Sequence, residues 1–256
     1  MNVQTYGQST NPAIMLLHGA GVSSWMWTEQ IEALCDSFYC VTVDLPGSGE
    51  SYQTEWISFE HTADQLAQII SERIPGGEAH VVGLSLGGYT ALFLLARHPE
   101  RVQSMIVSGV TSQPFPNQWL YRPLLNVVAA ISKWDPVIAL NARMMHLPAD
   151  IMPVYKRDSK RASSEMLKRV YDTLFEFTLP DPLYELSHRV LAVAGDKEAA
   201  LVRDGLPAFN RLPNGTAYLA PDARHGWSSE HPALFTAMIR AWVTDRPLPA
   251  ELLAHE

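Results

Sequence analysis

The sequence predicts an α/β fold, in which a mostly parallel central sheet is flanked by helices and carries a helical cap insertion. Short apolar runs rich in β-branched residues alternate with longer segments whose apolar residues recur at helical spacing. Such alternation is typical of a parallel sheet covered on both faces. It breaks between residues 113 and 186, where prolines recur and no segment has the pattern of a buried strand.

The composition describes a globular protein with a sizeable core. The chain has 256 residues, of which 47% are hydrophobic and 18% charged. Its net charge of −8 argues against nucleic acid or an anionic membrane as partner. We expect a small-molecule partner, and a monomer or homodimer. With only Cys35 and Cys40, no secretory signal pattern and no apolar run near the ~20 residues that span a bilayer, we expect a cytoplasmic protein.

The first half of the chain is predicted to supply four buried strands, at residues 13–17, 39–43, 80–84 and 102–107. Residues 1–12 are punctuated by glycine and proline and are expected to add at most one short edge strand. Helices are expected over residues 25–38, over 61–74, and from the serine turn at residue 85 to the proline at residue 99. The Asp-Leu-Pro-Gly-Ser-Gly run that begins at residue 44 is interpreted as a structural turn.

The second half resumes the alternation after the irregular segment. We predict strands at residues 189–194 and 216–219 and a last helix near residues 232–244. The tail from Arg246 has no apolar periodicity and is expected to fray. The predicted organisation is therefore a core of residues 1–112 and 187–256 with a helical cap at 113–186.

The fourth strand leads directly into Gly83-Leu84-Ser85-Leu86-Gly87, the pattern of a nucleophile elbow. In this turn a serine occupies a strained backbone position, and the flanking glycines prevent collisions with the neighbouring strand and helix. The turn exposes the Ser85 hydroxyl above the sheet edge, beside the free N–H groups of the next helix. Ser85 is therefore the candidate nucleophile.

Five motifs share their order and spacing with the α/β-hydrolase fold superfamily, which the chain resembles over nearly its whole length. They are the His-Gly-Ala-Gly run at residues 18–21, the turn at 44–51, the Ser85 elbow, the loop after Gly195 and the His-Gly pair at 225–226. The resemblance implies the fold strongly and implies hydrolysis, as in a serine esterase. It implies little about the substrate, because function depends on the site rather than on the fold.

A serine hydroxyl needs a base to take its proton, and His225 is the candidate because it follows the last strand in the order serine, acid, histidine. The partner acid of His225 stays open at this stage. In the family it usually falls three residues after the loop glycine, which here is Glu198, although Asp is more common there. Asp196 in the same loop is the rival, and Asp222 is a third candidate.

The resemblance also implies an oxyanion hole made of two backbone N–H groups, those of Ala20 and Leu86. Around it we expect a substrate pocket with Trp25, Trp119, Trp134 and Trp227, in a wall that would favour an apolar group. The cap adds Tyr121, Met144, Met145, Met152 and Tyr155 to this wall. The alternative is that most of these side chains pack the cap onto the core.

The cap is locally basic, and this is interpreted as a solvated helix face, with attraction of a carboxylate-bearing substrate as the alternative. The residues concerned are Lys156, Arg157, Lys160, Arg161, Lys168 and Arg169.

No metal-binding or phosphate-binding motif is visible, so no cofactor is expected. The sequence therefore predicts a serine hydrolase that cleaves a small, apolar carboxylic ester through an acyl-enzyme. The alternatives are hydrolysis of a carbon–carbon bond, a thioester or an amide with the same three side chains, and a non-catalytic small-molecule receptor with a hydrolase fold.

Overall fold

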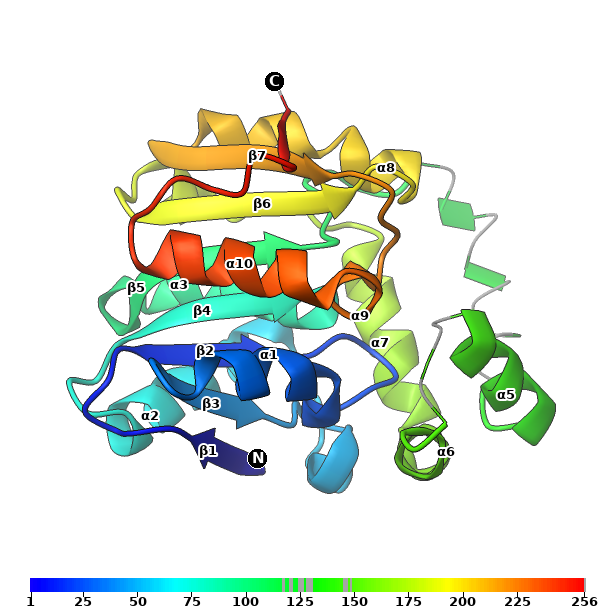
Figure 1. Cartoon of the computed structure of the whole chain (residues 1–256). Helices are drawn as coiled ribbons and strands as arrows, with labels where there is room; N and C mark the ends of the chain where they lie inside the picture. Colours follow the sequence, from blue (N-terminus) through cyan, green and yellow to red (C-terminus); the bar gives the residue numbers. More distant parts are fainter. Residues whose placement is uncertain are drawn as a thin grey trace.

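A computed structural model describes residues 1–116, 118–119, 122–123, 127, 131–144, 147 and 149–255. Its centre is one eight-stranded sheet in the order β1-β3-β2-β4-β5-β6-β7-β8 (Figure 1). The strands β2 to β7 run parallel, and the two edge strands β1 and β8 pair antiparallel with their neighbours. The strands are β1 Val3–Tyr6, β2 Ala13–Leu17, β3 Tyr39–Val43, β4 Ala79–Leu84, β5 Val102–Ser108, β6 Arg189–Gly195, β7 Asn214–Ala220 and β8 Leu253–Ala254.

Helices cover both faces of the sheet, because the central strands are apolar on both sides. One face carries α2 (Phe59–Arg73) and α3 (Leu86–Arg97), and the other carries α1 (Thr28–Leu34) and α10 (Pro232–Val243) (Figure 1). Shorter helical pieces occur at η1 Ser24–Trp27, η2 Gly49–Ser51, η3 Pro99–Arg101, η4 Asp181–Tyr184, α8 Ala200–Arg203, η5 Leu206–Arg211 and α9 Trp227–Glu230. Among the described residues, no helix is long and apolar enough to cross a bilayer.

The predicted fold class is confirmed, and most predicted elements agree with the structure to within two residues. The C-terminal tail is an exception, because it does not fray. Leu253 pairs with Leu219 of β7, and Leu252 is buried in the core on the α10 side. The predicted helix at residues 25–38 is shorter, since η1 precedes α1 and the helix ends at Leu34.

Three helices and η4 are described between β5 and β6, namely α5 (Asp135–Met144), α6 (Met152–Arg161) and α7 (Ser164–Leu174). In Figure 1, α5, α6 and α7 lie beyond the carboxyl ends of the parallel strands, where loops of such sheets form binding sites. Their attachment differs. The buried side chains of α7 belong to the same core cluster as α2 and α3, whereas Ile138, Ala142 and Tyr155 of α5 and α6 form a small cluster with Val22.

Candidate active site

Ser85 links β4 to α3 in a strained conformation, with a φ of +52°. Its backbone N–H donates to the carbonyl of Ser108 at 2.8 Å, which ties the turn to the end of β5. A Cβ at Gly83 would lie 2.4 Å from the carbonyl oxygen of Gly87, and one at Gly87 would lie 2.2 Å from that of Leu17. Only glycine fits at both positions, so the tight turn follows from the sequence.

His225 lies in the loop after β7, and its Nδ1 forms a hydrogen bond and ion pair with Oε1 of Glu198. Glu198 extends from the loop after β6, and only 3% of its side chain is exposed, whereas 51% of the His225 side chain is exposed. The second oxygen of Glu198 accepts from the backbone N–H of Gly195 at 3.3 Å. A buried acid therefore holds one edge of a ring that is still open to solvent.

The two rival acids have other partners. Asp196 accepts a hydrogen bond from the backbone N–H of Ala223 at 3.2 Å, which joins the loops after β6 and β7. Asp222 is exposed and pairs with Lys197. Of the three acids, Glu198 is the one whose hydrogen bond reaches His225.

The imidazole of His225 has an altered affinity for protons. Its removal from water lowers the pKa of His225, but the hydrogen bond and the negative charge of Glu198 raise it more. The pKa therefore lies above the ordinary value for histidine. Such a base holds the proton that it takes up more firmly than a free imidazole does, which suits a general base.

Gly109 is a residue that the sequence analysis did not single out. Its φ is +68°, and a Cβ there would lie 2.7 Å from Cε1 of His225 and 3.2 Å from Oε1 of Glu198. Gly109 follows Ser108, whose carbonyl accepts from Ser85. The end of β5 is thus in contact with both the serine turn and the histidine–acid pair. A glycine directly after a buried strand was the only signal in the sequence.

The loop after β2 begins at His18, which is fully buried. Burial lowers the pKa of His18, so the ring is neutral; its Nδ1–H donates to the Gly19 carbonyl at 2.7 Å and its Nε2 accepts from the Leu45 N–H at 2.9 Å. A Cβ at Gly19 would lie 3.6 Å from the Cβ of Ser85. Ala20, a predicted oxyanion donor, therefore directly follows the residue whose backbone approaches Ser85.

Leu86, the other predicted donor, is the first residue of α3. The first N–H groups of a helix have no acceptor within it, so the position of Leu86 is compatible with its predicted role. The two backbone groups chosen from the sequence thus belong to the two chain segments that flank Ser85.

The four predicted pocket tryptophans differ in their surroundings. Trp227 is fully buried; its Nε1 donates to Ser108 Oγ at 2.8 Å and its ring packs on Phe235. It is a core residue, which corrects its assignment to the pocket. Trp119 and Trp134 are 75% and 63% exposed, so they wall no closed cavity. Trp25 is half-buried, and its ring meets that of Tyr155 edge-on at 6.2 Å, while Tyr121 and Met145 lie outside the described residues.

The basic residues of α6 and α7 are neutralised by carboxylates of the same chain. Each of the six predicted residues forms an ion pair: Lys156 and Lys160 with Asp135, Arg157 and Arg161 with Glu50, Lys168 with Asp172, and Arg169 with Glu55 and Glu165. These charges support a solvated, paired helix face rather than a site for an acidic substrate.

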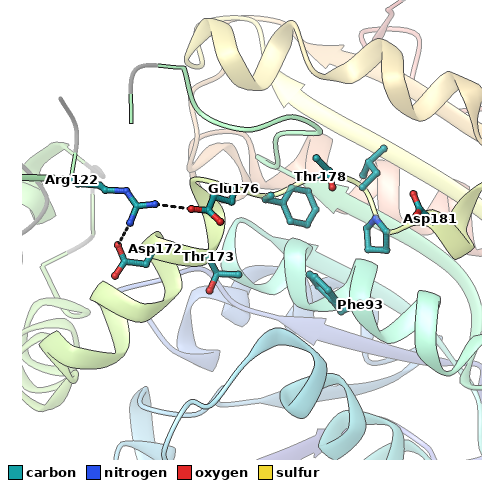
Figure 2. Close-up of a pocket in the computed structure, with 10 residues that line it drawn as sticks. Phe93, Arg122, Asp172, Thr173, Glu176, Thr178 and Asp181 are labelled. Carbon is teal, nitrogen blue, oxygen red and sulfur yellow. Dashed lines mark hydrogen bonds and ion pairs between the residues drawn. The ribbon is translucent and has the colours of Figure 1, made fainter. Parts of the chain in front are cut away.

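A cavity of about 660 Å³ lies beside the end of α7. In Figure 2, Arg122 points toward Asp172 and Glu176, with which it forms ion pairs at 3.0 Å each, while Phe93 lines the opposite part of the cavity. None of the predicted catalytic residues lines this cavity, so it is separate from the site around Ser85. Over the described part of the chain, no group of three or more His, Cys, Asp or Glu side chains could hold a metal ion.

Comparison with known proteins gives a consistent result. The model of the alpha/beta hydrolase fold family matches residues 12–160. A pimeloyl-[acyl-carrier protein] methyl ester esterase from Aeromonas hydrophila is 27% identical over 95% of this chain and 99% of its own. A putative carbamate hydrolase from Caulobacter is 26% identical over 90% of each chain. The solved structure of a thermophilic esterase from Thermogutta terrifontis superposes with a TM-score of 0.76 at 23% identity, over 95% of this chain and 93% of that one.

Proposed function

The chain belongs to the alpha/beta hydrolase fold family of enzymes, and on this basis we propose that it is a serine hydrolase that cleaves a small, apolar carboxylic ester through an acyl-enzyme. Ser85 is the nucleophile, His225 the general base and Glu198 the acid that orients His225. The observation that carries the proposal is the contact of one strand end, residues 108–109, with both the strained Ser85 turn and the His225–Glu198 pair.

The first step is the attack of the Ser85 hydroxyl on the ester carbonyl. The Nε2 of His225 accepts the hydroxyl proton as the oxygen–carbon bond forms, and the buried carboxylate of Glu198 stabilises the resulting imidazolium. The imidazolium then gives its proton to the alcohol that leaves. This step needs His225 in the tautomer with its proton on Nδ1, which the hydrogen bond to Glu198 favours.

Negative charge develops on the carbonyl oxygen during this attack. The N–H groups of Ala20 and Leu86 are proposed to stabilise it, and loss of one such donor costs about 3 kcal/mol in the transition state. In the second half of the reaction, His225 deprotonates a water molecule that attacks the acyl carbon. The bond to Ser85 then breaks, the imidazolium returns its proton to the Ser85 oxygen, and the carboxylic acid departs. The exposed edge of His225 leaves room for that water.

An ester is the favoured substrate class because the Aeromonas hydrophila relative is named for a methyl ester. A carbamate or amide is a second candidate, since the Caulobacter relative is named for a carbamate, and the same three side chains could also cleave a thioester or a carbon–carbon bond.

Cys35 and Cys40 are free thiols, which supports the expectation of a reducing, cytoplasmic compartment.

The test is hydrolysis of p-nitrophenyl esters of increasing acyl length, measured beside the matching anilides. We expect the short esters to be hydrolysed and Ser85→Ala to lose about 10⁶-fold in kcat, because the three residues act as a unit. Intact-mass measurement should detect an acyl or fluorophosphonate adduct on wild-type protein and none on Ser85→Ala. Equal turnover by both proteins would refute the proposal, and an unlabelled wild-type protein would favour the non-catalytic receptor.

A further inference from the structure

The loop after β2 is held between two buried carboxylates. Asp44, at the end of β3, accepts from both the backbone N–H and the hydroxyl of Ser24, at 2.9 and 2.6 Å. Asp158, in α6, accepts from the hydroxyl of Ser23 at 2.7 Å and from Nε1 of Trp25 at 3.1 Å. Asp44 comes from the end of a strand, and Asp158 comes from a helix more than 130 positions after Ser23 and Trp25, so the loop joins two separate parts of the chain.

Asp158 is the unexpected member of this pair. Its side chain is 3% exposed, although the other charged residues of α6 are between 36% and 49% exposed. Its remaining oxygen pairs with Arg157 at 2.9 Å, so both oxygens have partners. A buried carboxylate is retained only where its hydrogen bonds are complete, and two of those bonds go to the β2 loop.

The contacts form a closed network around the loop. Arg157 also pairs with Glu50 at 3.1 Å, and the backbone N–H of Glu50 donates to Asp44 at 3.0 Å. Hydrogen bonds from Ser24, Asn2 and Glu50 keep the pKa of Asp44 below its ordinary value, against the opposing effect of burial, so Asp44 is ionised. A Cβ at Gly49 would lie 2.6 Å from Asp44 and 2.7 Å from Ser23, which shows how tightly the network is packed.

The other end of this loop is the candidate oxyanion segment. Gly19 approaches Ser85, Ala20 carries a proposed donor, and Val22 is buried against Ile138 and Ala142 of α5. Only two residues separate Ala20 from Ser23, so the Ser23 and Trp25 contacts limit where the backbone at Ala20 can lie.

We propose that Asp158 is a positioning residue that sets the oxyanion loop from α6, so that the seating of this helix controls the rate of acyl transfer. The inference rests on the proposed function, because it assigns a role to the Ala20 N–H in that reaction. Asp158 does not touch the reacting atoms; it acts through Ser23 and Trp25. Because a displaced donor loses transition-state stabilisation rather than ground-state binding, the effect belongs in kcat and not in KM.

The experiment compares Asp158→Ala and Asp158→Asn with Asp135→Ala and Asp135→Asn. Asp135 is the matched control, since it is also a carboxylate paired with cations of α6 but is half-exposed and forms its ion pairs with Lys156 and Lys160. We expect Asp158→Ala to lower kcat for a p-nitrophenyl ester 10- to 100-fold with KM within threefold of wild type. Asp158→Asn keeps an acceptor for Ser23 and Trp25, so its kcat should stay within about fivefold of the wild-type value. The kcat of both Asp135 variants should stay within twofold of wild type.

A spectroscopic readout separates this inference from the hydrolase proposal. The indole N–H signal of Trp25, assigned with Trp25→Phe, should move in Asp158→Ala and stay in place in the Asp135 variants. A folded Asp158→Ala protein with unchanged kcat, or with a raised KM alone, overturns the inference. If Asp158→Ala does not fold, Ser23→Ala tests the inference in its place. We expect this variant to lose 3- to 10-fold in kcat, and an unchanged kcat would refute the inference. A wild-type protein that neither hydrolyses esters nor reacts with a fluorophosphonate refutes the hydrolase proposal instead, whatever the Trp25 signal does.

Discussion

The residues around Ser85 and the helices α5 and α6 are held in place by different kinds of interaction. The serine turn is built from backbone contacts at glycines and lies on a strand buried on both faces. By contrast, α5 and α6 contribute three buried side chains to a small cluster, and many of their other described contacts are half-exposed ion pairs, apart from the buried hydrogen bonds of Asp158. Backbone and apolar contacts in a packed core depend little on salt, whereas exposed ion pairs are weak and screened.

The helix α7 shows that the boundary between these two regions does not follow the chain. It lies in the segment predicted as a cap, but Met166, Val170 and Leu174 are buried in the cluster that includes the sheet. Its unfolding should therefore coincide with that of the core, while α5 and α6 can open locally. The hydrogen bonds of Asp158 to Ser23 and Trp25 connect α6, which can open locally, to the β2 loop of the core.

The largest expected effect is on the histidine–acid pair. Glu198→Gln should lower kcat about 10⁴-fold, since the amide no longer stabilises the imidazolium. The carboxylate raises the pKa of His225, so its removal lowers that pKa, and His225 then stays neutral to lower pH. The acid limb of the kcat/KM profile should therefore move to lower pH. Asp196→Asn is the control in the same loop, and an equal loss there would contradict the assignment of Glu198.

The next effect concerns the packing of the serine turn. Gly87→Ala places a methyl group 2.2 Å from the Leu17 carbonyl oxygen, and should lower the free energy of unfolding by roughly 3 kcal/mol or more. Denaturant unfolding measures this change. Gly226→Ala is the matched control, because a Cβ at Gly226 meets no atom within 4 Å and should leave the stability nearly unchanged. Similar losses in both variants would show that the close approach at Gly87 is not the cause.

A pair of core truncations tests the comparison between α7 and α5 directly. Leu174→Ala in α7 should lower the free energy of global unfolding by about 2–3 kcal/mol, as is usual for a leucine in a large core. Ile138→Ala in α5 removes a side chain that is more deeply buried than Leu174 but should cost less than about 1 kcal/mol globally, because α5 can open while the sheet stays folded. Hydrogen exchange should show faster exchange on α5 only in Ile138→Ala. Equal global losses would place both helices in one cooperative unit.

The smallest effect is expected at the exposed ion pairs. Asp135→Asn removes the partner of Lys156 and Lys160, all about half-exposed, and should change the Tm too little to resolve at 0.15 M salt. The measurement is thermal unfolding at low and high ionic strength, where any small difference from wild type should vanish at high salt. A large, salt-independent loss would mean that these charges contribute more than a solvated surface does.

Much of this molecule is predictable from local patterns. The strands β2 and β3 have the predicted bounds because a short apolar run between turn residues has few alternatives. The elbow at Ser85 is equally predictable. Glycines stand two positions before and two positions after the serine because a Cβ at either place would collide with the backbone. The tail is different, because it has no periodicity of its own. Leu252 is nevertheless buried in the core, and Leu253 of β8 pairs with Leu219, more than 30 residues earlier.

The order of strands, turns and chemically active side chains was thus determined by the sequence alone, because each depends on neighbours within a few residues. Only the tertiary structure decided three other features. It shows that Glu198 is the acid that faces His225, that Trp227 belongs to the core, and that Asp158 contacts the β2 loop. Two carboxylates in one loop have the same chemistry in a sequence. They differ only when distant segments leave a hydrogen-bond donor, such as the Ala223 N–H or the imidazole of His225, within reach of one and not the other.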